Sequence, residues 1–337
     1  MITFHNNIRL DMTDLKAVIE KRDMLINEVI AFFKRMGEEK KIKEIKVEPF
    51  NQGSYAMGTG NKAYHNEHDY DIDCGLLIEV NIKDYTPLQV KQWIFDALDS
   101  NQFRKVKWKK ACIRVQYTEE GFPKFHVDFA CYAKANDDGK TYLAKGTPTS
   151  APENRKWEIA EPKTLRDLIN NKFTNDEECS QFKRIIRDTK RWKDKQFSSV
   201  NGKPTGIALT ALAYHGFVPY TKDRFSSATD VNDLKALVNF VDSILGQFNP
   251  WNGRISVSLP VPPGNDLFAK VTDQQCEEFK KKLESLRNAL AEAEQEPDPH
   301  EACKILQRQF GDDFPVPTKE ATAEVRKKAV AGTSESA

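Results

Sequence analysis

The sequence lacks the cysteine pattern of a zinc-binding or disulfide-linked protein. Its six cysteines are scattered singly along 337 residues, and no two of them form a CxxC pair. A zinc ribbon needs closely spaced cysteine pairs, and a disulfide framework needs a denser set. His65, His68 and His126 have no HExxH spacing, and we expect them to be ordinary loop or strand residues. These absences argue against a zinc site and fit a reducing compartment.

The chain also lacks a long hydrophobic run. The longest apolar-rich stretch, Ile207 to Val218, contains Thr210 and His215, and it is shorter than the roughly 20 residues that a membrane-spanning helix needs. The first residues, MITFHNNIRLDMTD, contain no apolar core of the kind that a signal peptide has. We therefore expect a cytoplasmic protein without membrane association.

Neither sign of charge is in excess. Lysine and arginine number 51 against 50 acidic residues, which gives a net charge of +1. Proteins that coat nucleic acid usually carry a basic excess, so the sequence gives no sign that nucleic acid is required. One basic stretch, Arg104 to Lys110, contains Trp108. It could follow a nucleic-acid strand, but an edge strand protected by lysines explains it equally well.

Helix and strand patterns alternate in the first half of the chain, and helices dominate the second half. A helix is expected at 13–38, and Thr86 followed by Pro87 predicts another over 87–99. Strands are expected at 45–50, 70–80, 111–118 and 124–133, and 134–162 is expected to be a long loop. Later helices are expected at 163–173, 177–195, 205–216, 229–247, 272–295 and 299–309.

These patterns predict an α+β fold with two lobes. Residues 1–160 would form a mixed sheet with helices, including the long N-terminal helix, and residues 161–316 would form a helical lobe. Residues 317–337 contain few large apolar side chains, so we expect a flexible tail.

Three aspartates on two predicted strands form a candidate metal site. Asp71 and Asp73 share a strand face because side chains alternate along a strand, and Ile72 points to the other face. Asp128 lies between two apolar residues and has the same alternation. If the strands are neighbours, the three carboxylates converge, and their mutual repulsion calls for a cation. Hard oxygen ligands select Mg²⁺ or Mn²⁺, and two such ions can assist an in-line displacement.

Other polar residues lie close to these aspartates in the sequence. Asp69 precedes the pair in DYDID, shares their strand face and could be an outer ligand. Gly53 and Ser54 open a glycine-rich segment, residues 53–60, of the small residues that a backbone approaching phosphate needs. Taken alone, such a segment is more often only a loop, and a DxD pair more often lies on a solvated face. The combination favours a phosphate-transfer site.

A basic stripe is expected on the helix predicted at 177–195. Arg187, Lys190 and Arg191 fall three and four residues apart, so they share one helix face. Such a stripe could contact phosphate. For each of these residues except Lys190, a solvated helix face is an equally good explanation.

The Gly-Ser turn, the DxD pair and the later aspartate together resemble the polymerase-β-like nucleotidyltransferase superfamily. Within it, the chain looks most like the cGAS/DncV-like nucleotidyltransferases, which are the cyclic-oligonucleotide synthases of bacterial CBASS anti-phage signalling. The residue runs 190–192 (KRW), 204–209 (PTGIAL) and 310–315 (FGDDFP) resemble the helical lobe of that family. The resemblance implies a polymerase-β-like catalytic lobe and a helical lobe that closes the nucleotide pocket.

The resemblance also implies metal ligands. Asp71 and Asp73 would bind two Mg²⁺ ions, for which Mn²⁺ can substitute. Asp128 would bind the ion that activates the acceptor hydroxyl.

The nucleotide contacts come from the resemblance as well. Ser54, with the amide groups near it such as that of Gly53, would hold the β- and γ-phosphates. Lys190 would contact the donor triphosphate, and Arg187 belongs to the same stripe. Thr205 stands where the family often has a serine that touches the nucleotide.

The implied activity is the synthesis of a cyclic di- or trinucleotide from nucleoside triphosphates, with ATP as one substrate and GTP or another nucleotide as a candidate second one. Pyrophosphate would be released at each step. CBASS effector, conjugating or regulatory proteins are the partners that the resemblance implies. Two alternatives stay open: a nucleotidyltransferase that modifies an RNA 3′-end or a protein, and a catalytically inactive nucleotide-binding module.

Overall fold

The computed structural model describes residues 1–10, 12–41, 43–64, 70–99, 104–117, 125–198, 202–220 and 232–321. The chain forms two compact units. The sheet unit comprises residues 10–171 and 259–265, and the helical unit comprises residues 1–9, 172–258 and the chain from Asp266 onward. This division differs from the expected boundary at residue 160 in three places, because residues 1–9 belong with the helices, and residues 161–171 and 259–265 belong with the sheet.

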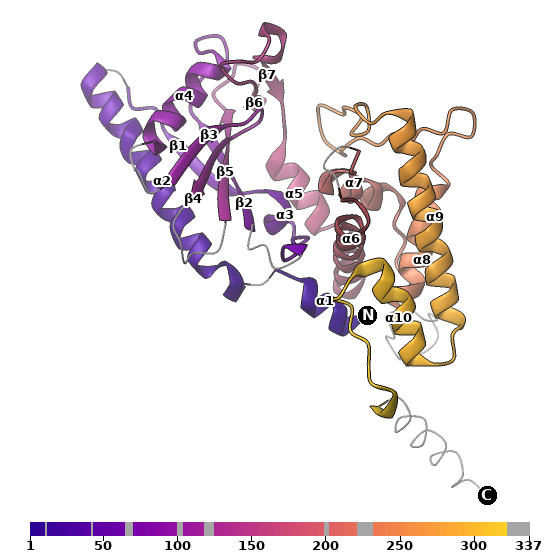
Figure 1. Cartoon of the computed structure of the whole chain (residues 1–337). Helices are drawn as coiled ribbons and strands as arrows, with labels where there is room; N and C mark the ends of the chain where they lie inside the picture. Colours follow the sequence, from indigo (N-terminus) through magenta and orange to yellow (C-terminus); the bar gives the residue numbers. More distant parts are fainter. Residues whose placement is uncertain are drawn as a thin grey trace, which may run out of the picture. The chain divides into compact units, whose positions relative to one another are not determined.

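A seven-stranded sheet organises the sheet unit (Figure 1). The pairing of β2 with β5 is parallel, and the other pairings are antiparallel. Two short strands, β6 and β7, lie within 134–162, where a loop was predicted, and that part of the prediction is wrong. In order across the sheet, the strands are β1 (Val47–Asn51), β2 (Tyr70–Ile78), β5 (Phe125–Ala133), β4 (Ile113–Tyr117) and β3 (Arg104–Trp108), with β6 (Tyr142–Ala144) on β5 and β7 (Trp157–Ile159) on β6.

The basic stretch that begins at Arg104 forms β3, which is the last strand of the described sheet on its side. Lys105 and Lys107 lie on one face of β3, with Lys105 exposed, and Val106 is buried on the other face. The edge-strand interpretation of this stretch is therefore correct.

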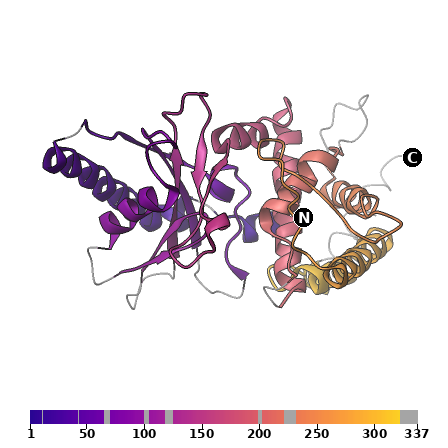
Figure 2. The ribbon, with the colours of Figure 1, turned by 90° about the horizontal axis from the view of Figure 1, so that it is seen from above.

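Two helices, α2 (Met12–Lys40) and α4 (Pro87–Leu98), cover one face of the sheet (Figure 2). The hydroxyl of Thr86 accepts a hydrogen bond from the amide of Gln89, so α4 begins at the predicted cap. The shorter helices of this unit are α3 (Gly53–Ala56), a 3₁₀ turn at Pro152–Asn154 and α5 (Pro162–Asn170). The core between helices and sheet includes Leu25, Val29, Phe33, Val90, Ile94, Cys74, Leu76, Val115, Val127 and Phe129.

The helical unit contains five of the six helices predicted for the second half of the chain and one helix from the N-terminus, whereas the helix predicted at 163–173 is α5 of the sheet unit. Phe4 of that first helix packs against Phe310 and Phe314, with ring centroids 5.1 and 4.8 Å away. No described helix is long and apolar enough to cross a membrane. The helices are α1 (Ile2–Ile8), α6 (Asp176–Gln196), α7 (Gly206–Gly216), α8 (Asp233–Leu245), α9 (Asp273–Gln295) and α10 (Pro299–Phe310).

A buried ion cluster ties α1 to α6 and α8. His5 Nδ1 lies 2.9 Å from Asp188 Oδ1, and His5 Nε2 lies 2.8 Å from Asp233 Oδ2. Burial by itself lowers the pKa of His5, but the charges and hydrogen bonds of the two carboxylates outweigh it and hold that pKa above the usual 6.5. Because each ring nitrogen faces a carboxylate, the cluster favours the doubly protonated imidazolium.

We expect this cluster to make stability depend on pH. Since the folded state raises the pKa of His5, the stabilisation is full below pH 6.5 and is lost as pH rises through the raised value. His5→Gln should lower the free energy of unfolding by about 3 kcal/mol near pH 6, and by less as the pH rises. Urea unfolding over a pH series measures this, with His215→Gln as the control. A His5→Gln deficit that does not change with pH would contradict the charged cluster.

Candidate metal and nucleotide site

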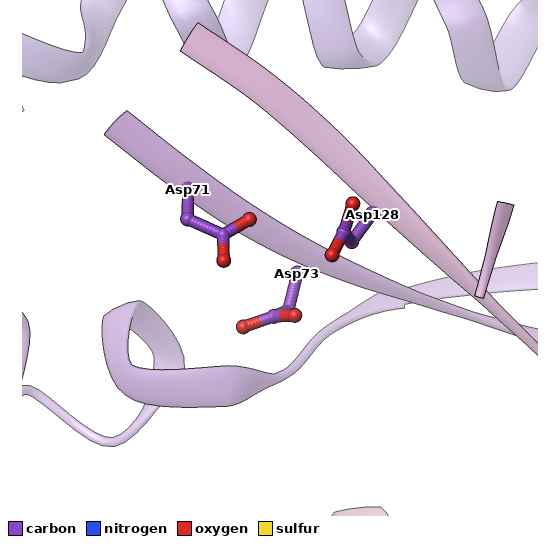
Figure 3. A group of neighbouring side chains, drawn as sticks. All are labelled: Asp71, Asp73 and Asp128. Atoms are coloured by element: carbon purple, nitrogen blue, oxygen red, sulfur yellow. The ribbon is translucent and has the colours of Figure 1, made fainter. Parts of the chain in front are cut away.

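The carboxylates of Asp71, Asp73 and Asp128 converge on one face of the sheet (Figure 3). The parallel register places Asp73 beside Asp128 and Asp71 beside His126. One oxygen from each aspartate lies within 4.8 Å of the others. The predicted convergence is therefore present, and metal binding at this point remains a prediction.

Alternation along the two strands fixes this arrangement. Ile72 on β2 and Val127 on β5 are fully buried on the opposite face. A register shift of one residue would expose these apolar side chains and bury the acidic ones, so core packing holds the carboxylates on their face. Exposure falls from Asp71, which is exposed, through Asp73 to Asp128, which is buried.

The donor set suits a divalent cation. All three groups offer carboxylate oxygen, which Mg²⁺ and Mn²⁺ prefer. Burial and the charge of Asp128 raise the pKa of the nearby Cys112 thiol well above the usual range, which favours its neutral form. In the part of the chain that the structure describes, the three aspartates are the acidic group placed to hold an ion. Asp69, His65 and His68 lie outside the described residues.

His126 and Arg114 flank the carboxylates. His126 Nε2 lies 3.5 Å from Asp71 Oδ1, so His126 borders the site, although the sequence analysis treated it as an ordinary residue. Arg114 donates from Nε and Nη2 to the two oxygens of Asp128, each at 2.7 Å. Burial disfavours the guanidinium charge, but the hydrogen bonds and charge of Asp128 outweigh it and raise the pKa of Arg114.

Sequence reasoning missed Arg114. Its place between buried Ile113 and Val115 indicates the polar face of a strand. Only the register, which pairs Arg114 with Asp128, identifies its partner.

The Gly53–Ser54 turn lies directly against the second aspartate. Gly53 has φ +70°, and a Cβ at this position would lie 1.9 Å from Asp73 Oδ2. The amide of Gln52 donates to the carbonyl of Asp73 at 3.2 Å, which joins the turn to β2. The backbone of Gly53 therefore comes as close to the carboxylates as a residue without a side chain allows.

Two residues singled out in the helical unit lie together. Lys190 on α6 reaches the first turn of α7, where its Cε would lie 3.4 Å from a Cβ placed on Gly206. Thr205 caps α7, and its hydroxyl accepts from the amide of Ala208 at 3.2 Å. The amino end of α7 thus carries a lysine and a hydroxyl next to its free amides.

The remaining arginines of the α6 stripe are buried. Arg187 is 6% exposed and Arg191 is 1% exposed, which excludes a solvated face for both. Burial lowers the pKa of Arg187 to about 10, and Arg191 lies 3.4 Å from Asp313. A contact between Arg187 and nucleotide remains a prediction.

Gly53→Ala should disrupt the site without unfolding the sheet, because the new methyl group would displace the carboxylate of Asp73. We expect Mn²⁺ affinity to fall at least about tenfold, and any nucleotidyl transfer to fall about a hundredfold, as for catalytic groups misplaced by an ångström. Isothermal titration and product assays measure the two effects.

Gly139→Ala is the matched control for this substitution. Gly139 has φ +68°, but nothing lies within 4 Å of a Cβ placed on it. The backbone strain is therefore similar and the clash is absent. Equal loss of Mn²⁺ affinity in both variants would contradict the role of Gly53.

The sheet order, the Gly-Ser turn and the carboxylates on two neighbouring strands define a nucleotidyltransferase fold of the polymerase-β-like class. Residues 47–132 match the family model described as the nucleotidyltransferase domain of DncV-like cyclic GMP-AMP synthases. This part of the chain is therefore similar to the nucleotidyltransferase domain of DncV-like synthases, in agreement with the resemblance that the sequence motifs indicated.

The chain is also similar to individual proteins over most of its length. A cyclic GMP-AMP synthase of Escherichia albertii is 24% identical over 267 residues, which are 77% of this chain and 55% of the relative. The chain thus spans about half the length of that curated relative. The crystal structure of the Vibrio cholerae DncV cyclic AMP-GMP synthase superposes with a TM-score of 0.70 at 17% identity, covering 93% of this chain and 96% of that one. For its GTP-bound form, the TM-score is 0.72 with 92% of each chain covered.

Proposed function

We propose that this chain is a metal-dependent nucleotidyltransferase that joins nucleoside triphosphates into a cyclic di- or trinucleotide, a second messenger of anti-phage defence. The observation that carries the proposal is the convergence of Asp71, Asp73 and Asp128 beside Gly53 within a DncV-like domain. The Vibrio cholerae relative has been solved with GTP and with a linear intermediate of A and G. ATP and GTP are therefore the first substrates to test, and CBASS effector, conjugating or regulatory proteins are the proposed partners.

The residues of the sheet unit would hold the metal and the phosphates. Asp71, Asp73 and Asp128 would bind Mg²⁺, or Mn²⁺ in its place. When bound, two such ions would lower the pKa of the acceptor hydroxyl and neutralise the charge of the leaving pyrophosphate. Core packing holds the three carboxylates in position before substrate arrives. Gly53 lets the backbone approach the Asp73 carboxylate without a clash, and Ser54 would add a hydroxyl and an amide for phosphate.

The helical unit would add positive charge for the donor triphosphate. Lys190 carries an ammonium group at the amino end of α7, where free amides and the helix dipole also favour an anion. The hydroxyl of Thr205 accepts its hydrogen bond from Ala208, so its own proton is available for donation to phosphate. Arg187 would contribute a buried positive charge from the same helix as Lys190.

Incubation of the purified chain with Mg²⁺ and labelled nucleoside triphosphates tests the activity. We expect a phosphatase-resistant product whose mass corresponds to a cyclic di- or trinucleotide. Asp73→Asn should reduce its formation at least about a thousandfold, because catalysis of phosphoryl transfer is mainly electrostatic. Asp137→Asn is the control, since Asp137 is exposed and pairs with Lys83 away from the triad.

Other outcomes of this assay would replace the proposal. Label on RNA or protein would indicate a nucleotidyltransferase that modifies a macromolecule. Tight nucleotide binding without turnover in Mg²⁺ or Mn²⁺, with or without phage-derived activators, would indicate an inactive binding module.

Lys190→Gln tests the role of the helical unit. Losing the ammonium group should raise KM for the donor nucleotide about tenfold, because one charge-assisted contact to phosphate disappears. Lys195→Gln, at an exposed position of the same helix, should leave KM unchanged. Steady-state kinetics measure both, and equal KM values for Lys190→Gln and the unchanged chain would remove Lys190 from the site.

A further inference from the structure

Arg114 holds the third carboxylate of the triad by both oxygens. Its Nε and Nη2 each lie 2.7 Å from an oxygen of Asp128. The same Nη2 lies 3.7 Å from Asp71 Oδ2, too far for a hydrogen bond. Arg114 is therefore mainly the partner of Asp128, and it leaves the triad with about the charge that one divalent ion neutralises.

This contact affects a cation and a triphosphate in opposite directions. A cation at Asp128 must share its oxygens with the guanidinium or displace a hydrogen bond, and the two positive charges repel each other. The three carboxylates repel a triphosphate, and the positive charge of Arg114 reduces that repulsion. The salt bridge is only partly exposed, with side-chain exposures of 24% for Arg114 and 10% for Asp128, so water screens it incompletely.

We propose that Arg114 is a positioning residue and counter-ion of Asp128 that weakens the binding of a divalent cation alone and strengthens the binding of a triphosphate before metal arrives. The proposal rests on the proposed function, because it takes the triad as the place where metal and triphosphate meet. The positive charge beside Asp128 comes from the guanidinium of Arg114.

Arg114→Met tests the proposal, because methionine removes the charge and keeps much of the side-chain volume. We expect Mn²⁺ to bind on the order of tenfold more tightly in the absence of nucleotide, and ATP in EDTA to bind about threefold more weakly. Titration calorimetry and Mn²⁺ electron paramagnetic resonance measure the first effect, and fluorescent ATP displacement measures the second. If the substitution only misplaced Asp128, Mn²⁺ would bind more weakly. The direction of the change in Mn²⁺ affinity therefore distinguishes loss of the counter-ion from damage to the site.

Three further variants complete the test. Arg114→Lys keeps the charge and should stay within about threefold of the unchanged protein for both ligands. Lys107→Met removes a positive charge from the same sheet face. Lys107 is opposite Arg114 in the register and donates to Gln116 rather than to an aspartate, so both affinities should change less than about twofold. If Arg114→Met does not fold, Arg114→Gln replaces it, because glutamine keeps a hydrogen-bond donor for Asp128. The same results are expected: tighter binding of Mn²⁺ and weaker binding of ATP in EDTA.

Asp73→Asn separates this proposal from the proposed function. If it binds Mn²⁺ as the unchanged chain does, the triad is not the metal site and the proposed function fails. If Asp73→Asn loses Mn²⁺ while the neutral Arg114 variant binds Mn²⁺ equally or more weakly, the metal site stands and the counter-ion role is overturned.

Discussion

The structure depends on keeping three like charges together against their mutual repulsion. The parallel pairing of β2 with β5 brings Asp73 and Asp128 side by side, and Asp71 follows on the same face. Charges this close repel by several kcal/mol at the effective dielectric constant of a protein surface. Without compensation, the two strands would be driven apart at this point.

Hydrophobic packing on the other face of the same strands opposes that repulsion. Ile72, Val127 and Phe129 are fully buried, so sliding or separating β2 and β5 would expose them. Arg114 reduces the repulsion further, because its guanidinium pairs with both oxygens of Asp128. The free energy of burying these apolar side chains therefore offsets the repulsion and keeps the three carboxylates close together.

Sequence reasoning identified the acidic face of the sheet because the sequence signal for it is local. Strand alternation placed Asp71 and Asp73 on one face, and the apolar neighbours of Asp128 identified a second strand. The parallel pairing that joins them is not local, and neither is the contact between Arg114 and Asp128. These depend on register, which is set by the whole core.

The parts of the fold that the sequence did not predict have physical reasons as well. Helix α1 is only seven residues long, and its stability comes from tertiary contacts of Phe4 and His5 rather than from an amphipathic repeat. Strands β6 and β7 have three residues each, within a segment rich in turn formers, so no alternation could be recognised. The boundary predicted at residue 160 was placed where the sequence pattern changes from strands to helices. The compact units are instead defined by which segments pack together in space.

A crystal structure with Mn²⁺ and a non-hydrolysable nucleoside triphosphate tests the central claim most directly, through the anomalous scattering of manganese. Manganese should lie about 2.0–2.3 Å from oxygens of Asp71, Asp73 and Asp128, with phosphate oxygens completing its coordination. Manganese bound to phosphate alone, with Asp128 outside its coordination sphere, would contradict the account.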